Sequence, residues 1–272
     1  MASIISFATM IFMLMPAAAP AFGTVIIAGF GWRGLFASFI AFAVITTLWL
    51  GLRQPETLAH ADKRPLTLRL LSAGLCEVLS HRSTLVCIAV LTVGFGILFA
   101  TLSSTQQIFD VSFGRGRSFA LWFGLIALLS LPAGFINARL VDRLGMRCLV
   151  TLTFGAQPVI TLGTLALTKA AILPETLAFA VFVIWSITVF WMANIVFGNL
   201  NAIALEPLGQ MAGLASSVVM ATATVLAVGV AAPLGQLFDG TPTPLLVGMA
   251  ILLMIAVILM VLMPREATVI SP

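Results

Sequence analysis

The chain contains eight stretches of 19 to 25 residues without a single Asp, Glu, Lys or Arg. Each could cross a bilayer as a helix, because a helix rises about 1.5 Å per residue and the hydrocarbon core is about 30 Å thick. A backbone inside lipid must satisfy its own hydrogen bonds, as a helix does. The sequence therefore predicts an all-α polytopic membrane protein with eight transmembrane helices at 4–28, 34–52, 84–107, 118–137, 148–168, 177–198, 211–234 and 244–263.

The composition supports a membrane protein with no separate soluble domain. Apolar residues make up 61% of the chain and charged residues 8%, whereas soluble domains have about 45–50% and about 25%. The net charge of +4 could suggest nucleic acid, but the basic residues stand in short loops beside the apolar spans. We therefore expect the lipid bilayer as a partner and no nucleic acid.

The basic residues divide unequally between the two sides of the predicted membrane. Arg33, Arg115, Arg117 and Lys169 fall on one side, and nine fall on the other: Arg53, Lys63, Arg64, Arg69, Arg82, Arg139, Arg143, Arg147 and Arg265. Cytoplasmic loops carry the excess of Lys and Arg. The side with nine is predicted to be cytoplasmic, and an even number of spans places both termini there.

No catalytic or metal-binding constellation stands out. His60 and His81 share one polar loop, and Cys76, Cys87 and Cys148 lack the close pairing of metal or redox sites. The pattern predicts neither an enzyme nor a metal or cofactor site. The residues Ala17-Ala18-Ala19 resemble a signal cleavage site, but the apolar run continues beyond them to Ile27, which favours a spanning helix.

The polar stretch 53–82 divides the chain into two helices at 1–52 and six helices at 83–272. Within it, residues 66–79 carry apolar side chains at helical spacing, which is typical of an amphipathic helix on the cytoplasmic surface. A solvated linker that contains several leucines is the alternative.

Five short runs lie at the ends of the predicted spans: Gly31-Trp32-Arg33-Gly34-Leu35-Phe36, Pro55-Glu56-Thr57-Leu58, Asn199-Leu200-Asn201-Ala202, Glu206-Pro207 and Met211-Ala212-Gly213-Leu214-Ala215-Ser216-Ser217. In this order they resemble drug-resistance exporters of the major facilitator superfamily, Bcr/CflA branch. The resemblance implies helices five to twelve of a twelve-helix fold, with Met1 placed after the first four. It also implies residence in the bacterial inner (plasma) membrane.

A loop motif of the same superfamily resembles the run 139–147, which contains Arg139, Asp142, Arg143, Gly145 and Arg147. Its first glycine is replaced by Ala138. Gly145 permits a tight turn, and the charged residues can pair with helix ends or with one another during gating. A plain basic anchor explains the arginines but not the aspartate or the glycine.

Pro16, Pro20 and Gly23 in the first span resemble the family's antiporter motif, although its doubled glycine is incomplete here. A similar phrase in the seventh span contains Pro233 and Gly235. The two spans would be equivalent under the pseudo-symmetry of such transporters. Proline bends a helix and glycine permits close contact, so both would flex between the halves. Chance repetition in an alanine-rich sequence is the alternative.

Polar and aromatic groups inside apolar spans indicate a cavity or a helix contact. One face of the third span holds Thr92, Phe95, Phe99, Ser103 and Gln106; the sixth span holds Trp185, Trp191, Asn194 and Gly198. By the resemblance both helices line the substrate cavity, where aromatic rings and amides suit bulky amphipathic compounds. The alternative is that the aromatics face lipid and the amides join helices. Gln157 and Pro158 are predicted to form a satisfied kink.

The resemblance implies export of small molecules, drugs among them, by proton-coupled alternating access as part of a twelve-helix transporter. No acidic residue lies within a predicted span, so we expect the coupling carboxylate outside this chain and no gradient-driven exchange by the chain alone. A non-transporting remnant or a partner-dependent membrane subunit is the competing hypothesis.

Overall fold

The computed structural model describes residues 2–54, 68–170 and 172–263, and leaves out the side chains of residues 2–18, 20, 21, 68–71, 73 and 210. These residues form helices and connecting turns, with no β-strand among them. Among the described residues, seven helical segments are long and apolar enough to cross a membrane, and the first of them starts at Phe22. The predicted span 4–28 lies mostly before that start. The all-α polytopic membrane fold is confirmed.

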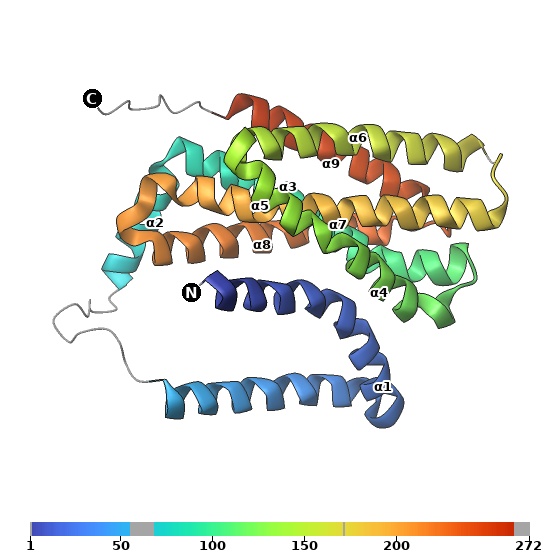
Figure 1. Cartoon of the computed structure of the whole chain (residues 1–272), viewed down its shortest axis with the longest axis horizontal. Helices are drawn as coiled ribbons and strands as arrows, with labels where there is room; N and C mark the ends of the chain where they lie inside the picture. The colour runs from blue at the N-terminus through green and yellow to red at the C-terminus, as the bar shows by residue number, and fades with distance from the viewer. Residues whose placement is uncertain (1, 55–67, 171, 264–272) are drawn as a thin grey trace.

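Helix α1 (Ala2–Arg53) holds both of the first two predicted spans. Its backbone is non-helical at Gly31, with φ 68° and ψ −178°, a conformation that is essentially restricted to glycine. The helix folds back at this point, so its two arms run antiparallel (Figure 1). The side chains from Phe39 to Leu52 on the second arm are all exposed.

Helix α2 (Leu68–Ser80) occupies part of the polar stretch between the two sets of spans. It contacts α3 (Arg82–Gln107) and α8 (Ala212–Gln236). Gly74 and Val78 are buried, and the Leu214 side chain of α8 lies directly over Gly74. The helical interpretation of this segment is therefore correct, and the bundle covers Gly74 and Val78 on one face of the helix.

The predicted span 118–137 is divided into two helices, α4 (Phe119–Ser130) and α5 (Pro132–Leu144). Pro132 is the cause, because a proline has no N–H and its ring clashes with the preceding turn. The turn around Leu131 is closed by tighter bonds, from Leu131 N to Leu128 O at 3.2 Å and from Gly134 N to Leu131 O at 3.3 Å.

The remaining spans follow the predicted order as α6 (Met146–Ala170), α7 (Glu175–Leu205), α8 and α9 (Thr243–Leu262). Short segments join them: the π-helix η2 (Ile108–Ser112) extends α3, and the 3₁₀ helices η3 (Gly116–Ser118) and η4 (Glu206–Met211) precede α4 and α8. Positive-φ glycines at Gly114, Gly145 and Gly240 make the tight connections.

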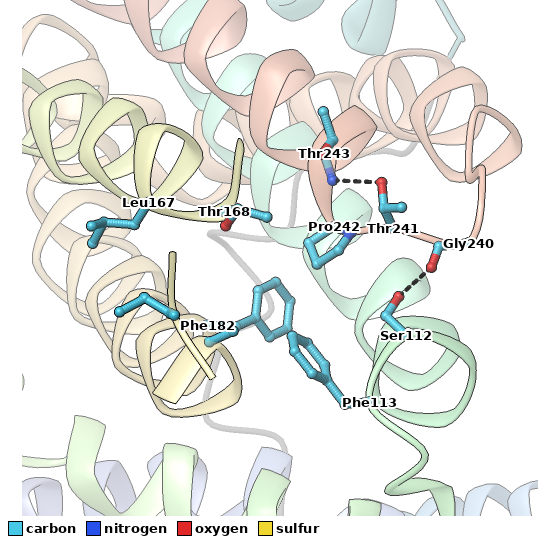
Figure 2. A pocket seen from close by; sticks show the side chains of 11 residues that line it. Ser112, Phe113, Leu167, Thr168, Phe182, Gly240, Thr241, Pro242 and Thr243 are labelled. Atoms are coloured by element: carbon cyan, nitrogen blue, oxygen red, sulfur yellow. Dashed lines mark hydrogen bonds between the residues drawn. The ribbon is translucent and has the colours of Figure 1, made fainter. Parts of the chain in front are cut away.

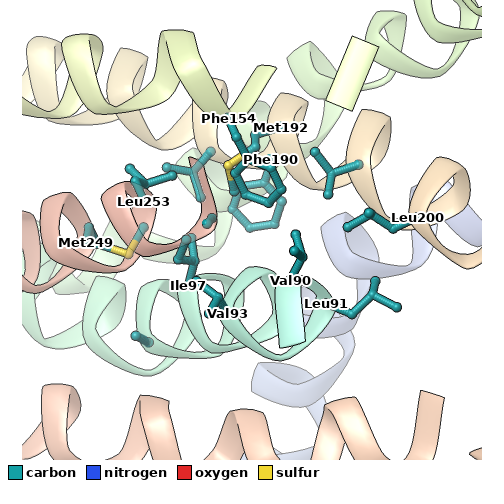
Figure 3. Close-up of a cluster of buried hydrophobic side chains, with 14 of the residues drawn as sticks. Val90, Leu91, Val93, Ile97, Phe154, Phe190, Met192, Leu200, Met249 and Leu253 are labelled. Atoms are coloured by element: carbon teal, nitrogen blue, oxygen red, sulfur yellow. The ribbon is translucent and has the colours of Figure 1, made fainter. Parts of the chain in front are cut away.

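Helix α3 lies at the centre of the bundle, where it contacts α7, α8 and α9. Figure 3 shows side chains of α3, α6, α7 and α9 meeting in the buried core, including Ile97, Phe154, Met192 and Leu253. Helix α8 packs on α3 through small residues: Gly96 faces Val230, and Ala223, Ala227 and Ala231 repeat every fourth position of α8. Close approach of helix backbones stabilises contacts inside membranes.

Candidate functional site

A groove of about 360 Å³ lies between α3 and α8. Its lining comes from Phe99, Ser103 and Gln107 of α3 and from Val228, Ala231, Ala232 and Gly235 of α8. Gly235 lies beside Ser103, and a Cβ there would be at ordinary contact distance, 3.4 Å, from the Ser103 hydroxyl. No ionisable side chain lines this groove. It therefore offers aromatic and aliphatic surface with one hydroxyl and one amide.

Three phenylalanine rings continue the wall of the groove from α3 to α7. Phe95 stacks on Phe99 with 5.9 Å between ring centroids and on Phe197 of α7 with 4.2 Å. Gly94 lies under Phe197, where a Cβ would come within 3.1 Å of the ring. All three rings are partly exposed. Such a surface can bind apolar and aromatic groups.

The face predicted on α3 stays together in the structure. Phe99 and Ser103 line the groove, Phe95 stacks beside them, and Gln106 is exposed one turn beyond Ser103. Thr92 is buried and donates to the Ile88 carbonyl at 2.8 Å. The groove contains Gln107 rather than Gln106.

The residues predicted on α7, which are Trp185, Trp191 and Asn194, do not line the groove beside the α3 face. Trp185 is fully buried, its indole N–H donates to the Thr161 hydroxyl at 3.1 Å, and its ring packs on Phe182. Trp185 and Asn194 are nine residues apart, which is two and a half helical turns, so they lie on opposite sides of α7. Thr188, which accepts a hydrogen bond from Gln157 at 3.0 Å, satisfies the amide beside Pro158 as predicted.

Trp191 and Asn194 bind the break between α4 and α5. The indole N–H of Trp191 donates to the Leu129 carbonyl at 2.9 Å, and the Asn194 amide donates to the Ser130 carbonyl at 3.4 Å. In an unbroken helix these two carbonyls would accept from residues 133 and 134. The proline-induced turn removes at least the second bond, because Gly134 N bonds to Leu131 O. These side chains therefore join helices in this structure.

The charged motif lies around the turn between α5 and α6. Gly145 ends α5 with φ 77°, and its N–H bonds to Val141 O at 2.9 Å. The Arg147 guanidinium donates to the Met263 carbonyl, just after the last turn of α9. Arg139, Asp142 and Arg143 are exposed, and Asp142 makes no ion pair with any described residue. The structure therefore contains a tight turn at Gly145 and a helix-end contact at Arg147, and the gating role of these residues stays a prediction.

The proline motifs are described in part. The side chains of Pro16 and Pro20 lie outside the described part of the chain, and Gly23 is half-buried in a helical segment. Pro233 lies inside α8, one turn before its end, and Gly235 contacts Ser103 in the groove. The pairing of the two phrases remains a prediction.

Among the described residues no three His, Cys, Asp or Glu side chains are close enough to hold a metal ion. Cys76, Cys87 and Cys148 form no disulfide, and Cys87 is buried.

Sequence reasoning missed the α8 side of the groove, Gln107 and Phe197. The α8 residues are small and apolar, so their type alone gives no sign of a binding surface. Phe197 had a signal, because it follows Asn194 by three residues and therefore lies near it on α7.

Two comparisons with known proteins agree with this architecture. Residues 2–232 match the family model of the Major Facilitator Superfamily. Over 222 residues, or 80% of the chain, the sequence is 23% identical to the bicyclomycin resistance protein homolog of Haemophilus influenzae. The chain spans about half of that relative, since the match covers 54% of the relative's length.

Proposed function

The chain belongs to the major facilitator superfamily, and from this we propose that it acts in the export of small amphipathic molecules, drugs among them, across a membrane. The similarity to a resistance protein homolog supports this substrate class. The proposed mechanism is alternating access driven by a proton gradient. The proposed location is a bacterial inner membrane with both termini cytoplasmic, supported by the unequal distribution of Lys and Arg.

The observation that carries the proposal is the groove between α3 and α8 with the phenylalanine stack beside it. Phe95, Phe99, Ser103 and Gln106 would contact the substrate from α3, together with Gln107 and Phe197. Apolar and aromatic walls with a few polar groups are typical of small-molecule sites. We assign Trp185, Trp191 and Asn194 to helix packing, on the hydrogen bonds that each donates.

We propose that the chain divides according to the two six-helix halves of a twelve-helix transporter. Residues 1–52 belong to the first half, 53–82 to the central loop and 83–272 to the second half. Alternating access requires these parts to rock around the substrate site. The bond from Arg147 to the end of α9 would fix the α5–α6 turn in one of the two states, and Arg139, Asp142 and Arg143 are exposed for partners in the other. No ionisable group lines the groove, so proton coupling would use a group elsewhere.

A dye-efflux assay with paired variants tests the proposal. Ala232→Leu fills the groove, whereas Ala156→Leu makes the same change at an exposed position of α6. Cells that express a twelve-helix transporter with this chain as helices five to twelve are loaded with a fluorescent amphipathic dye, and efflux is followed with and without a proton gradient. We expect gradient-dependent efflux that falls at least tenfold in Ala232→Leu and stays within twofold in Ala156→Leu, at equal membrane expression.

Equal effects of the two variants would exclude the groove as the site. If this twelve-helix transporter reaches the membrane folded and moves no dye, the result favours the competing hypothesis of a non-transporting remnant or a partner-dependent subunit.

A further inference from the structure

A second cavity of about 250 Å³ lies beyond the C-terminal ends of α3 and α8, and it shares no lining residue with the groove. Figure 2 shows it enclosed by the end of α3 with η2, the end of α6, the start of α7 and the connection from α8 to α9. We call it the hydroxyl pocket. Its lining is Ser112, Phe113, Leu167, Thr168, Leu173, Ala178, Phe182, Gly240, Thr241, Pro242 and Thr243.

Three of the hydroxyl groups in this pocket already donate their hydrogens to the protein. Ser112 donates to the Gly240 carbonyl at 2.7 Å, and Thr168 donates to the Thr164 carbonyl at 2.8 Å. Thr241 donates to the Asp239 carboxylate at 2.7 Å. A hydroxyl has one hydrogen and two acceptor lone pairs. These three groups can therefore offer a ligand only acceptor oxygens, of which the Thr241 oxygen already accepts one bond, from the Thr243 N–H at 3.3 Å. The Thr243 hydroxyl can serve as donor or acceptor.

The apolar side of the pocket is aromatic. The rings of Phe113 and Phe182 lie 5.9 Å apart and point into the same space (Figure 2). The adjoining ring of Phe179 already carries a cation, since the Arg115 guanidinium lies 4.4 Å from its centroid. Aromatic faces attract cations by their quadrupole, and Phe113 and Phe182 are the two aromatic residues that line the pocket.

Three charged groups lie near the pocket: the Asp239 carboxylate, the Lys169 ammonium and the Arg115 guanidinium. Hydrogen bonds from the Thr241 hydroxyl and then its backbone N–H lower the pKa of Asp239 below its ordinary value, so the carboxylate stays ionised at neutral pH. The positive charge of Lys169 lowers the same pKa further and offsets the negative charge of Asp239 toward a ligand.

We propose that the hydroxyl pocket is a second binding site, which takes a small protonated amine that carries one apolar ring. An alkylammonium has three hydrogen-bond donors and no acceptor, which complements the acceptor oxygens of Ser112, Thr168 and Thr241. Its ring would pack against Phe113 and Phe182. The volume is that of about eight waters at about 30 Å³ each, so a one-ring amine fits and a large drug does not. The site does not depend on transport through the groove.

The probe is benzylamine, and phenylacetate is its counterpart of similar size and opposite charge. The full chain is placed in lipid nanodiscs, and equilibrium dialysis at pH 7 measures binding after subtraction of the amount taken up by empty nanodiscs. We expect saturable binding of benzylamine and none of phenylacetate. Saturable binding of phenylacetate at equal affinity, or no saturable binding of benzylamine, would overturn the proposal.

A matched pair of variants on α6 locates the site. Thr168→Val removes a pocket oxygen, whereas Thr153→Val removes the equivalent back-bonded hydroxyl, which donates to Leu149 O at 2.7 Å, about 22 Å away along the helix. We expect Thr168→Val to weaken benzylamine binding about tenfold, as for loss of one hydrogen bond to a charged group. Thr153→Val and the conservative Thr168→Ser should bind within twofold of the unmodified chain.

Ala178→Leu provides an independent test, because it fills the pocket from α7 without removing a polar group. Saturable binding should be lost in this variant while the protein stays monodisperse. Equal affinities in Thr168→Val and Thr153→Val, or full binding by a folded Ala178→Leu chain, would place the amine elsewhere and contradict the proposal.

Discussion

At the scale of single residues, glycine conformation decides where the helices turn. Gly31 and Gly145 combine a positive φ with an extended ψ, at φ 68°, ψ −178° and φ 77°, ψ 151°. Side chains with a Cβ rarely adopt this region. Both residues are exposed with no atom within 4 Å of an added Cβ, so backbone conformation rather than crowding explains why glycine is needed there.

Gly145→Ala should therefore destabilise the protein by about 1–3 kcal/mol. Gly155→Ala in α6 is the matched control, since its Cβ would also meet open space but its backbone is helical. Alanine in a helix is more favourable than glycine by about 0.5–1 kcal/mol, so the control should be neutral or more stable. Thermal unfolding of the two purified variants measures the difference. A loss of stability in the control as large as in Gly145→Ala would show that the cause is general and not the turn.

At the scale of elements, Pro132 leaves backbone carbonyls of α4 without their helical donors, and side chains of α7 donate to two of them. The break it introduces between α4 and α5 exposes carbonyls of the last turn of α4, and the side chains of Trp191 and Asn194 donate to them. Backbone groups freed by proline inside a membrane are satisfied by neighbouring helices in this way. This explains why two polar groups of α7 lie against an apolar helix.

Trp191→Phe keeps the ring and removes the donor, and we expect a loss of about 0.5–1.5 kcal/mol, within the range of membrane hydrogen bonds. In a Pro132→Ala background, the new N–H at position 132 can donate to the Leu128 carbonyl. If the segment straightens, the N–H of residue 133 can also donate to the Leu129 carbonyl. The cost of Trp191→Phe should then shrink by at least about 0.5 kcal/mol, a coupling that a double-mutant cycle of unfolding free energies detects. Additive effects would contradict the link between the break and the indole.

The contact between α3 and α8 gives a second prediction at this scale. A Cβ on Gly96 would approach Val230 to 2.9 Å at Cγ1 and 3.1 Å at Cβ. Gly96→Ala should destabilise the protein by about 1–3 kcal/mol through overpacking, and Val230→Ala should restore much of this loss in the double variant. Gly163→Ala, where a Cβ meets nothing within 4 Å, is the control. Stability is measured by thermal unfolding, and failure of Val230→Ala to rescue would show that the helices adjust elsewhere.

At the scale of the whole molecule, the distribution of Lys and Arg predicts the orientation in the membrane. Exposed residues on the two sides allow this orientation to be measured. Cys148 begins α6 beside the basic motif and is exposed, whereas Arg117 lies in η3 between α3 and α4 and is also exposed. The positive-inside rule places the first on the cytoplasmic side and the second outside.

An impermeant maleimide should therefore label Arg117→Cys in intact cells when Cys76, Cys87 and Cys148 are replaced by serine. A variant that retains Cys148 alone should be labelled only after the cells are permeabilised. Both proteins are labelled after denaturation to confirm equal amounts. The reverse pattern would overturn the proposed orientation and the helix numbering that follows from it.

The all-α membrane class, the order of the spans and the tight turn at Gly145 could be predicted from the sequence. These are properties of single segments: length, absence of charge and the conformational freedom of residues such as Gly145 can be recognised without knowing what lies beside them. The polar and aromatic face of α3 from Phe95 to Gln106 was recognisable for the same reason, since it depends on the helical period alone.

The helix that packs against this face of α3 could be identified from the tertiary structure and not from the sequence. Its partner in the groove is α8, whose small residues carry no chemical signal, and close packing of Gly96 and Gly235 brings the two helices together. Trp185 lies in the core and donates to Thr161, and Trp191 donates to the Leu129 carbonyl beside the Pro132 break. The physical reason is that a polar group inside a membrane must find a partner, and which partner is within reach depends on how the helices pack, a fact that no single span contains.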